Sequence, residues 1–309
     1  MPSELDGTHH FLTRQVLLFM RSVLGYAPPH QNAGPPLMST YMRPPLKWAG
    51  GKFRLLDRIL PALPPGKRLV EPFVGSGAVF LNADYPAFLL CDLNGDLIAF
   101  LKTLAERGAH FIDACAGYFG PEFNSADRYY RIREQFNTLP QGEERAALFL
   151  YLNRHAYNGL MRYNSKGKFN TPFGRYTAPY FPRVEMEAVA AKARKADITF
   201  AVTDFRQTFA ALRPGDVVYC DPPYVPLSQT ANFTSYTAFS FSEQDQRELS
   251  RCALTAKDNG NTVVVSNHDT AFTREIYKDA ERFRFHVRRF ISCDGKNRGT
   301  AQELLAVFS

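Results

Sequence analysis

The chain has 309 residues, five cysteines and a formal net charge of +7. This length is far above the size at which a hydrophobic core becomes marginal, so the fold needs no crosslinks. The cysteines are odd in number and contain no Cys-x-x-Cys pair. They therefore indicate neither a disulfide framework nor a zinc site, and a reducing, cytoplasmic compartment fits best. The positive charge permits a polyanionic partner, and five basic residues without an acid at 154–176 are better evidence for one.

Residues 1–43 differ from the rest and are expected to form a mobile extension with a linker. Residues 11–26 are compatible with one amphipathic helix, but Glu4 and Asp6 precede it without any Lys or Arg. This pattern is wrong for a signal peptide, and the apolar run is too broken to span a membrane. Residues 27–37 are rich in Pro and read as a linker. Deletion of residues 1–37 is expected to leave activity nearly unchanged.

The first organised segment, 44–60, contains Gly-Gly-Lys at 50–52. No Ser or Thr follows Lys52 and no strand precedes it, which argues against a site for a nucleoside triphosphate. A short apolar strand begins near Arg68 and is followed by Gly75, Gly77 and a helix. Glycines at this point let a ligand approach the backbone closely. The pattern is only half of a dinucleotide-binding fingerprint, because Phe80 stands where Gly or Ala is required.

A second strand, at 87–92, ends in Asp92, about fifteen residues beyond Gly77. Close to this spacing, dinucleotide-binding sheets place an acid that accepts the ribose hydroxyls. Asp92 is therefore the candidate ligand contact, whereas Asn94 and Asp96 are expected to cap the following helix.

The remaining pattern predicts one α/β sheet with an insertion. Residues 96–157 have apolar residues at helical spacing, and 157–181 carry the Gly and Pro punctuation of hairpins and loops. Strands are predicted at 198–204, 216–220, 262–266, 283–290 and 304–308, alternating with helices at about 183–194, 243–258 and 271–278. This alternation predicts a Rossmann-like, doubly wound sheet built from 44–95 and 182–309, interrupted by a partly helical module at 96–181.

The strand at 216–220 runs directly into Asp221, Pro222, Pro223 and Tyr224. In open α/β sheets, ligands bind at the carboxyl ends of strands, so Asp221 and Tyr224 are expected at a site. The two prolines forbid a continuing strand, and the Pro222 carbonyl stays available as an acceptor. Together these groups can hold an amino group on a planar heterocycle. On these four residues alone, an N-cap aspartate followed by turn prolines is an equally good interpretation.

Taken together, these motifs resemble the Dam-type DNA adenine-N6 methyltransferases of the D12 class, which use S-adenosylmethionine. The resemblance covers roughly residues 44 to 309, in the family's order. The matching stretches are 46–52 (LKWAGGK), 70–77 (VEPFVGSG), 92–94 (DLN), 148–154 (LFLYLNR), 157–164 (YNGLMRYN), 169–176 (FNTPFGRY), 221–224 (DPPY), 231–234 (ANFT) and 266–270 (SNHDT). Residues 1–40 have no counterpart.

The resemblance implies a role for each motif at the cofactor and the reacting base. Asp221 and the Pro222 carbonyl would bind the adenine amine, and Tyr224 would stack on a base flipped out of the duplex. Cofactor contacts would come from Trp48, Lys52, Phe73, Gly75, Gly77, Asp92, Asp204 and Asp221, with Asp92 at the ribose diol and Asp204 beside the cofactor adenine.

The same resemblance implies double-stranded DNA as the partner and GATC as its target. Arg162 would read a guanine, Lys47 the outer guanine, and Leu160 with Pro172 the thymine methyl. Tyr157 and Asn158 would fill the space of the flipped adenine, and Tyr176 lies in a matching stretch of the DNA-binding module. For Leu160 and Pro172, simple packing of the hairpin is an open alternative. No metal and no membrane contact is expected, and the protein is expected to act as a monomer in a bacterial or phage-infected cytoplasm, at the nucleoid.

Three alternatives stay open from the residues alone. An Asn- or Asp-Pro-Pro-Tyr enzyme could act on RNA adenine, cytosine or protein glutamine, although it would lack the 157–176 module. A catalytically silent DNA-binding relative would keep the basic stretches but would lose Asp92, Asp221 or Tyr224. A nicotinamide dehydrogenase would explain Gly75, Gly77 and Asp92 and leave residues 221–224 without a role.

Overall fold

The computed structural model describes residues 41–225, 241–288 and 300–309. The predicted extension lies almost wholly outside this part of the chain, including the helix at 11–26 and the linker at 27–37. The matching stretch at 231–234 and the last two residues of the strand predicted at 283–290 also lie outside it.

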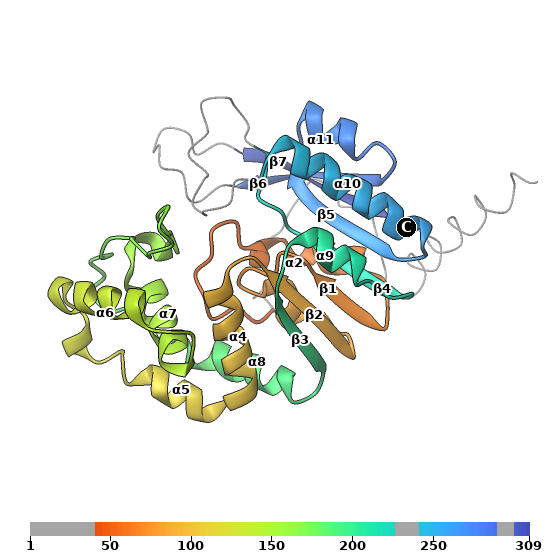
Figure 1. Cartoon of the computed structure of the whole chain (residues 1–309). Helices are drawn as coiled ribbons and strands as arrows, with labels where there is room; N and C mark the ends of the chain where they lie inside the picture. The colour runs from red at the N-terminus through yellow and green to blue at the C-terminus, as the bar shows by residue number, and fades with distance from the viewer. Residues whose placement is uncertain (1–40, 226–240, 289–299) are drawn as a thin grey trace, which may run out of the picture. The chain divides into compact units, whose positions relative to one another are not determined.

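Seven strands of the described residues form one sheet in the order β3-β2-β1-β4-β5-β7-β6 (Figure 1). β1 to β5 pair with one another in parallel, whereas β7 is antiparallel to both β5 and β6. This arrangement confirms the predicted Rossmann-like α/β fold. The strands are β1 (Arg68–Glu71), β2 (Ala87–Asp92), β3 (Asp197–Val202), β4 (Asp216–Cys220), β5 (Thr262–His268), β6 (Glu281–Arg288) and β7 (Thr300–Phe308).

The central strand β4 is buried along its whole length. Val217 and Tyr219 pack into the hydrophobic core on one face of the sheet, and Val218 and Cys220 into the core on the other. A strand covered on both faces requires a continuous apolar run, which explains why 217–220 show no alternation of polar and apolar residues.

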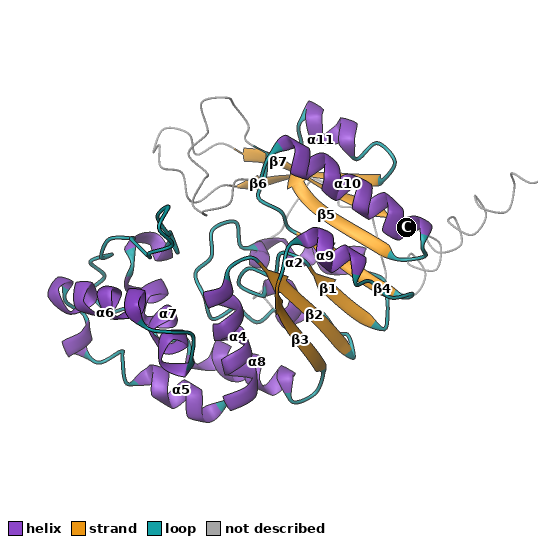
Figure 2. Ribbon diagram, in the orientation of Figure 1, coloured by secondary structure: helices purple, strands orange, loops and turns teal. Residues whose placement is uncertain are grey.

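Helices cover both faces of the sheet (Figure 2). The core on one face is completed by α2 (Leu56–Ile59), α3 (Ala78–Asn82), α4 (Gly95–Arg107) and α8 (Arg183–Ala193). The core on the other is completed by α9 (Phe205–Ala210) and α10 (Glu243–Asp258), with α11 (Ala271–Ile276) packed against α10. The helices predicted at 183–194, 243–258 and 271–278 are confirmed to within two residues at their ends.

Between α4 and α8 the chain forms α5 (Ala109–Ala116), α6 (Ala126–Thr138) and α7 (Glu143–His155), then a hairpin. The short 3-10 helices η1 (Lys52–Leu55), η2 (Leu60–Ala62), η3 (Pro121–Phe123) and η4 (Tyr157–Gly159) complete the described helical segments. α4 packs on β2 and β3 as well as on α7, so it joins the helical segment to the sheet. That residues 96–181 form a separate inserted module remains a prediction.

The hairpin at 157–176 is closed by isolated bridges between Ala156 and Phe173 and between Tyr163 and Phe169. Helix α6 holds it at two further points. The Tyr129 hydroxyl donates to the Thr171 carbonyl at 2.9 Å, and the Asn137 side chain bonds to both the amide and the carbonyl of Phe169. The hairpin backbone is thus fixed by side chains from the scaffold, as loop-rich segments require.

Candidate active site

Asp221 stands at the carboxyl end of β4, where its carboxylate meets a buried lysine. Lys52, only 7% exposed, places Nζ 2.8 Å from Asp221 Oδ1. The Ser266 hydroxyl, from β5, donates to the same oxygen at 3.1 Å. Burial raises the pKa of Asp221, and the Lys52 charge and the two hydrogen bonds oppose this effect. One carboxylate oxygen is therefore held, while Oδ2 has no hydrogen bond or ion pair within the described part of the chain.

Tyr224 is fixed beside this ion pair on three sides. Lys52 Nζ lies 4.4 Å from the centroid of its ring, and the His268 ring contacts it edge-on at 4.6 Å. Its hydroxyl donates to Glu303 Oε2, on β7, at 3.1 Å. The structure thus brings Asp221, Tyr224 and Lys52 together, although no sequence pattern indicated that Lys52 pairs with Asp221.

The glycine loop after β1 lies directly against Trp48. Gly75 has a φ of +50°, and a Cβ at this position would come within 3.0 Å of the Trp48 indole ring. The Gly75 amide donates to Asp92 Oδ2 at 3.2 Å, and the Asn94 amide donates to Oδ1 at 2.9 Å. Burial raises the pKa of Asp92, and these backbone hydrogen bonds oppose it. Trp48, Gly75 and Asp92 therefore border one small region, as a cofactor site requires.

The segment 48–52 connects this region to Asp221. Lys52 Nζ donates to the Gly50 carbonyl at 2.5 Å, and the Gly51 amide donates to the Trp48 carbonyl at 3.1 Å. A Cβ on Gly51 would lie 3.9 Å from the Ser76 hydroxyl, so the two glycine-rich loops are in contact. One short segment thus carries both the indole and the ammonium group to the carboxyl edge of the sheet.

Phe73 and Asp204 lie next to α9. The Phe73 ring packs against Phe205 and Phe241, each at 5.7 Å between centroids. Asp204 caps α9, because its side chain accepts from the Arg206 amide at 2.9 Å, and it also pairs with the Arg206 guanidinium. Capping of α9 thus explains the position of the Asp204 side chain without any ligand. A contact between Asp204 and the cofactor adenine remains a prediction.

Some of the predicted DNA-binding residues contact other side chains, and others are exposed to solvent. Lys47 Nζ lies 4.0 Å from the centroid of Tyr176, and burial lowers the pKa of Lys47. Arg162 donates from Nε to Asn170 Oδ1 at 2.8 Å, across the hairpin. In contrast, Tyr157 is 53% exposed, and Asn158 and Pro172 are exposed as well, with Leu160 partly so.

A single buried amide joins the Lys47 segment to the hairpin. Asn153 on α7 accepts from the Lys47 amide at 2.9 Å and donates to the Lys47 carbonyl at 2.7 Å. It also donates to the Gly159 carbonyl at 3.1 Å. A Cβ on Gly159 would come within 2.6 Å of the Lys47 side chain, so only glycine fits this contact.

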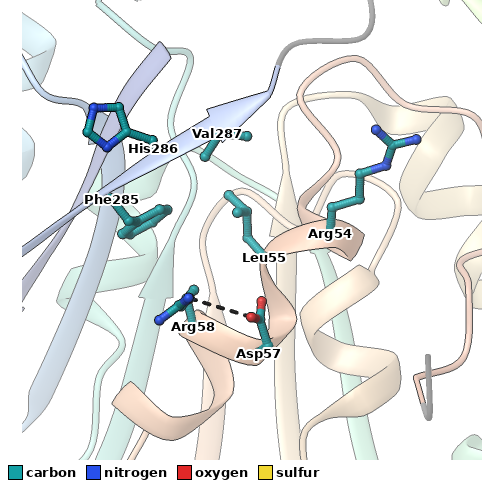
Figure 3. A pocket seen from close by; sticks show the side chains of 7 residues that line it. All are labelled: Arg54, Leu55, Asp57, Arg58, Phe285, His286 and Val287. Atoms are coloured by element: carbon teal, nitrogen blue, oxygen red, sulfur yellow. Dashed lines mark ion pairs between the residues drawn. The ribbon is translucent and has the colours of Figure 1, made fainter. Parts of the chain in front are cut away.

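A cavity of about 300 Å³ lies elsewhere, between the segment formed by η1 and α2 and the edge strand β6 (Figure 3). It is lined by Arg54, Leu55, Asp57, Arg58, Phe285, His286 and Val287. None of these belongs to the predicted site residues. Across residues 41–225, 241–288 and 300–309, no cluster of three or more His, Cys, Asp or Glu side chains could hold a metal ion. In the same ranges, no helix is both long and apolar enough to cross a membrane.

Comparison with known proteins identifies the family. Residues 48–290 match the family described as D12 class N6 adenine-specific DNA methyltransferase. A DNA adenine methylase of Serratia marcescens is 49% identical over 264 residues, which cover 85% of this chain and 97% of that protein. The DNA adenine methylases of Salmonella typhi (49%) and Escherichia coli K12 (48%) each match over 263 residues, covering 85% of this chain and 94% of theirs.

The chain belongs to the D12 class of N6 adenine-specific DNA methyltransferases.

Membership of this class makes the protein a DNA adenine methyltransferase that requires a methyl donor and a DNA substrate. Several residues around the D12 motif at 221–224 were not predicted from the sequence. Ser266 contacts Asp221, Glu303 contacts Tyr224, and Gln246 donates to the Pro223 carbonyl at 2.8 Å. Of these three, only Ser266 left a signal, because it begins the matching stretch 266–270 and is a polar residue that directly follows the apolar run of β5.

Proposed function

We propose that this methyltransferase transfers a methyl group from S-adenosylmethionine to the exocyclic N6 of an adenine flipped out of double-stranded DNA, within the sequence GATC. The proposed chemistry rests on the environment of the Asp221 carboxylate. Lys52 and Ser266 hold Oδ1, and Oδ2 is open within the described residues.

The adenine amine is a poor nucleophile, because its lone pair is delocalised into the ring. Asp221 Oδ2 and the Pro222 carbonyl would each accept one N–H of the amine and so make the nitrogen more tetrahedral. Both acceptors lie on a rigid turn at the end of β4, so they need no rearrangement during the reaction. Lys52 favours the ionised form of the carboxylate and orients it, since its ammonium group lies 2.8 Å from Oδ1.

The cofactor region fits S-adenosylmethionine, which supplies a sulfonium methyl group when bound. Gly75 leaves room where any side chain would strike the Trp48 indole, and the backbone there can approach the methionine part. The Asp92 carboxylate would accept the ribose hydroxyls, and Phe73 would pack near the cofactor with Trp48. Lys52, Gly77 and Asp204 complete the proposed contacts.

The DNA part rests on the hairpin at 157–176. Its backbone is held by α6 and α7, while Tyr157, Asn158 and Pro172 are exposed. Direct readout needs side chains that match base edges and stand on a fixed backbone. A bidentate Arg matches guanine, and apolar groups match the thymine methyl. Arg162 and Lys47 would read the two guanines, Leu160 and Pro172 the thymine methyl, and Tyr157 with Asn158 would occupy the space of the flipped base. Tyr176 would hold Lys47 in place through its ring, 4.0 Å away. A single copy contains all these residues, so we infer that a monomer suffices.

The test is to digest DNA from cells that express the protein with methylation-sensitive and methylation-dependent enzymes that recognise GATC. Protection from the former and cleavage by the latter are expected. Methylation rates are then measured on GATC duplexes and on variants that differ by one base pair, with titration of S-adenosylmethionine. Equal rates on cognate and near-cognate duplexes would contradict the proposed target.

A further inference from the structure

Two buried side-chain amides lie directly behind residues 221–225, which are called the catalytic turn below. Asn267, on β5, is fully buried, and Gln246, on α10, is 2% exposed. Asn267 Nδ2 donates to Gln246 Oε1 at 3.0 Å and to the Tyr277 hydroxyl at 3.2 Å. Gln246 Nε2 in turn donates to the Pro223 carbonyl at 2.8 Å. None of these side chains contacts the predicted substrate groups, and the mechanism above does not use them.

The orientation of both amides follows from one backbone carbonyl. The Pro223 carbonyl can only accept, so Gln246 must point Nε2 toward it and Oε1 toward Asn267. Asn267 must then present Nδ2 to Gln246, which turns its Oδ1 toward the amides of Val225, at 3.3 Å, and His268, at 2.9 Å. Every donor and acceptor of Asn267 is thus used, and flipping either amide would leave buried polar groups unpaired.

The turn itself has few groups by which it could be held. Pro222 and Pro223 have no N–H, so the fold can grip this segment only through its carbonyls and the amides that follow. Gln246 takes the Pro223 carbonyl and Asn267 the Val225 amide, and His268 Nδ1–H donates to the Val225 carbonyl at 2.7 Å. The Pro222 carbonyl, which precedes these contacts, has no hydrogen-bond partner within the described ranges.

We propose that Asn267 and Gln246 are positioning residues for methyl transfer: the buried amide pair fixes the backbone of the turn and thereby aims the Pro222 carbonyl at the substrate amine. This inference rests on the proposed roles of Asp221 and Pro222. A displacement of about 1 Å in a reacting group can cost roughly a hundredfold in rate. The amide pair therefore controls the chemical step and leaves binding of the methyl donor unchanged.

The experiment compares the same substitution at the two ends of one strand. Asn267→Asp removes the donors and places a carboxylate against Gln246 Oε1. Asn261, immediately before β5, is also a buried amide, and its Nδ2 donates to the carbonyls of Arg213, at 2.7 Å, and Asp216, at 3.2 Å. Asn261→Asp therefore places a carboxylate against two carbonyls at the opposite edge of the sheet and is the matched control.

Single-turnover methylation of duplex DNA, calorimetric binding of S-adenosylmethionine and thermal melting are measured for both variants. We expect Asn267→Asp to lower the methyl-transfer rate about tenfold to a hundredfold and to leave donor affinity within about twofold. Asn261→Asp should melt at a similarly reduced temperature and transfer methyl groups at the wild-type rate. Equal rates in wild type and Asn267→Asp, or equal losses in both variants, would overturn the inference. A wild-type protein inactive on DNA would overturn the proposed function as well.

Gln246→Glu gives an independent readout should Asn267→Asp fail to fold. The substituted side chain would repel the Pro223 carbonyl as a carboxylate, but as a carboxylic acid it could donate to it. The rate of the variant relative to wild type should therefore rise as the pH falls from about 8 to about 6. Tyr277 and His268 also bond to this network and are present in both proteins, so the ratio of the two rates isolates the effect of the substitution. A ratio that stays near one across this range would contradict the positioning role.

Discussion

The turn at 221–225 and the hairpin at 157–176 differ in how their proposed functional side chains are held. At the turn, the side chains themselves are fixed: Asp221 by Lys52 and Ser266, and Tyr224 by Glu303 and His268. In the hairpin, the scaffold fixes the backbone at Phe169 and Thr171, and Tyr157, Asn158 and Pro172 remain exposed. The difference matches the two proposed tasks, because methyl transfer requires preorganised charges, whereas base readout requires a fixed backbone that presents side chains to base edges. Arg162 is intermediate, since its Nε donates to Asn170 Oδ1 across the hairpin.

The largest effect is expected at the turn, from Asp221→Ala. The variant loses an acceptor for the substrate amine, so its methyl-transfer rate should fall at least about a hundredfold. Lys52 keeps its bond to the Gly50 carbonyl and its contact with Tyr224, so folding and donor binding should be largely retained. Single-turnover kinetics, with melting as a control, check this. A rate above about a tenth of wild type, a loss near 1.4 kcal/mol, would remove Asp221 from its proposed role.

Asp92→Ala should act on binding of the methyl donor rather than on turnover. A hydrogen bond to a charged group contributes about 1.5–3 kcal/mol, so the dissociation constant for S-adenosylmethionine should rise at least about tenfold. Titration calorimetry measures it, and saturating donor should restore most of the rate. An unchanged affinity would place Asp92 outside the site.

Arg162→Ala should change sequence discrimination and leave chemistry on the cognate duplex less affected. If Arg162 makes a bidentate contact with guanine, its loss costs about 1–3 kcal/mol and relaxes discrimination at that base pair. Lys168→Ala, on the same hairpin and exposed, is the control. It should weaken binding to all duplexes alike and reduce the salt slope by about one. If Arg162→Ala instead weakens binding to all duplexes alike, as expected for Lys168→Ala, Arg162 contacts a phosphate rather than a base.

The smallest effect concerns stability at the carboxyl edge of the sheet, where Glu71 is buried and its Oε1 has no hydrogen-bond partner within the described structure. Burial raises the pKa of Glu71 well above its ordinary value. Its contribution to stability is therefore present below the unfolded pKa, near about 4.3, and is lost as the pH rises through the folded pKa.

Glu71→Gln removes this ionisation. The free energy of unfolding of the variant should therefore exceed that of wild type at high pH, by about 1.4 kcal/mol for each unit between the two pKa values. Urea unfolding between about pH 5 and about pH 8 measures the difference. Parallel curves for the two proteins would show that Glu71 does not titrate in this range.

Sequence patterns predicted the sheet well, because central strands such as β4 and β5 are apolar runs with a clear stop, whereas the edge strand β6 alternates charged or polar residues with apolar ones. The run 217–220 ends at Asp221 and 87–91 at Asp92, and parallel strands bring such ends to one edge. Trp48 beside Gly75 was expected only from the family resemblance, since nothing in the local sequence relates residues this far apart.

The supporting residues were missed because their roles are entirely tertiary. Gln246 is one polar residue on an amphipathic helix, and only packing of α10 on the sheet turns it toward Pro223. Lys52 was expected at the cofactor, but its pairing with Asp221 depends on how a glycine-rich loop folds back on itself. Asp204 shows the reverse case, because it was expected only beside the cofactor adenine, whereas the structure shows that its side chain caps α9.

The two prolines also decide how the catalytic turn can be observed. Pro222 and Pro223 carry no exchangeable amide hydrogen, so hydrogen–deuterium exchange cannot report on them. The Val225 amide is the first one after them that donates a hydrogen bond within the described residues, to Asn267 Oδ1, and it is therefore the most useful reporter. Slow exchange at Val225 would mean that the turn opens only with the surrounding strands, and fast exchange that it opens locally. One amide hydrogen can thus measure how often the methyl-transfer geometry is lost in solution.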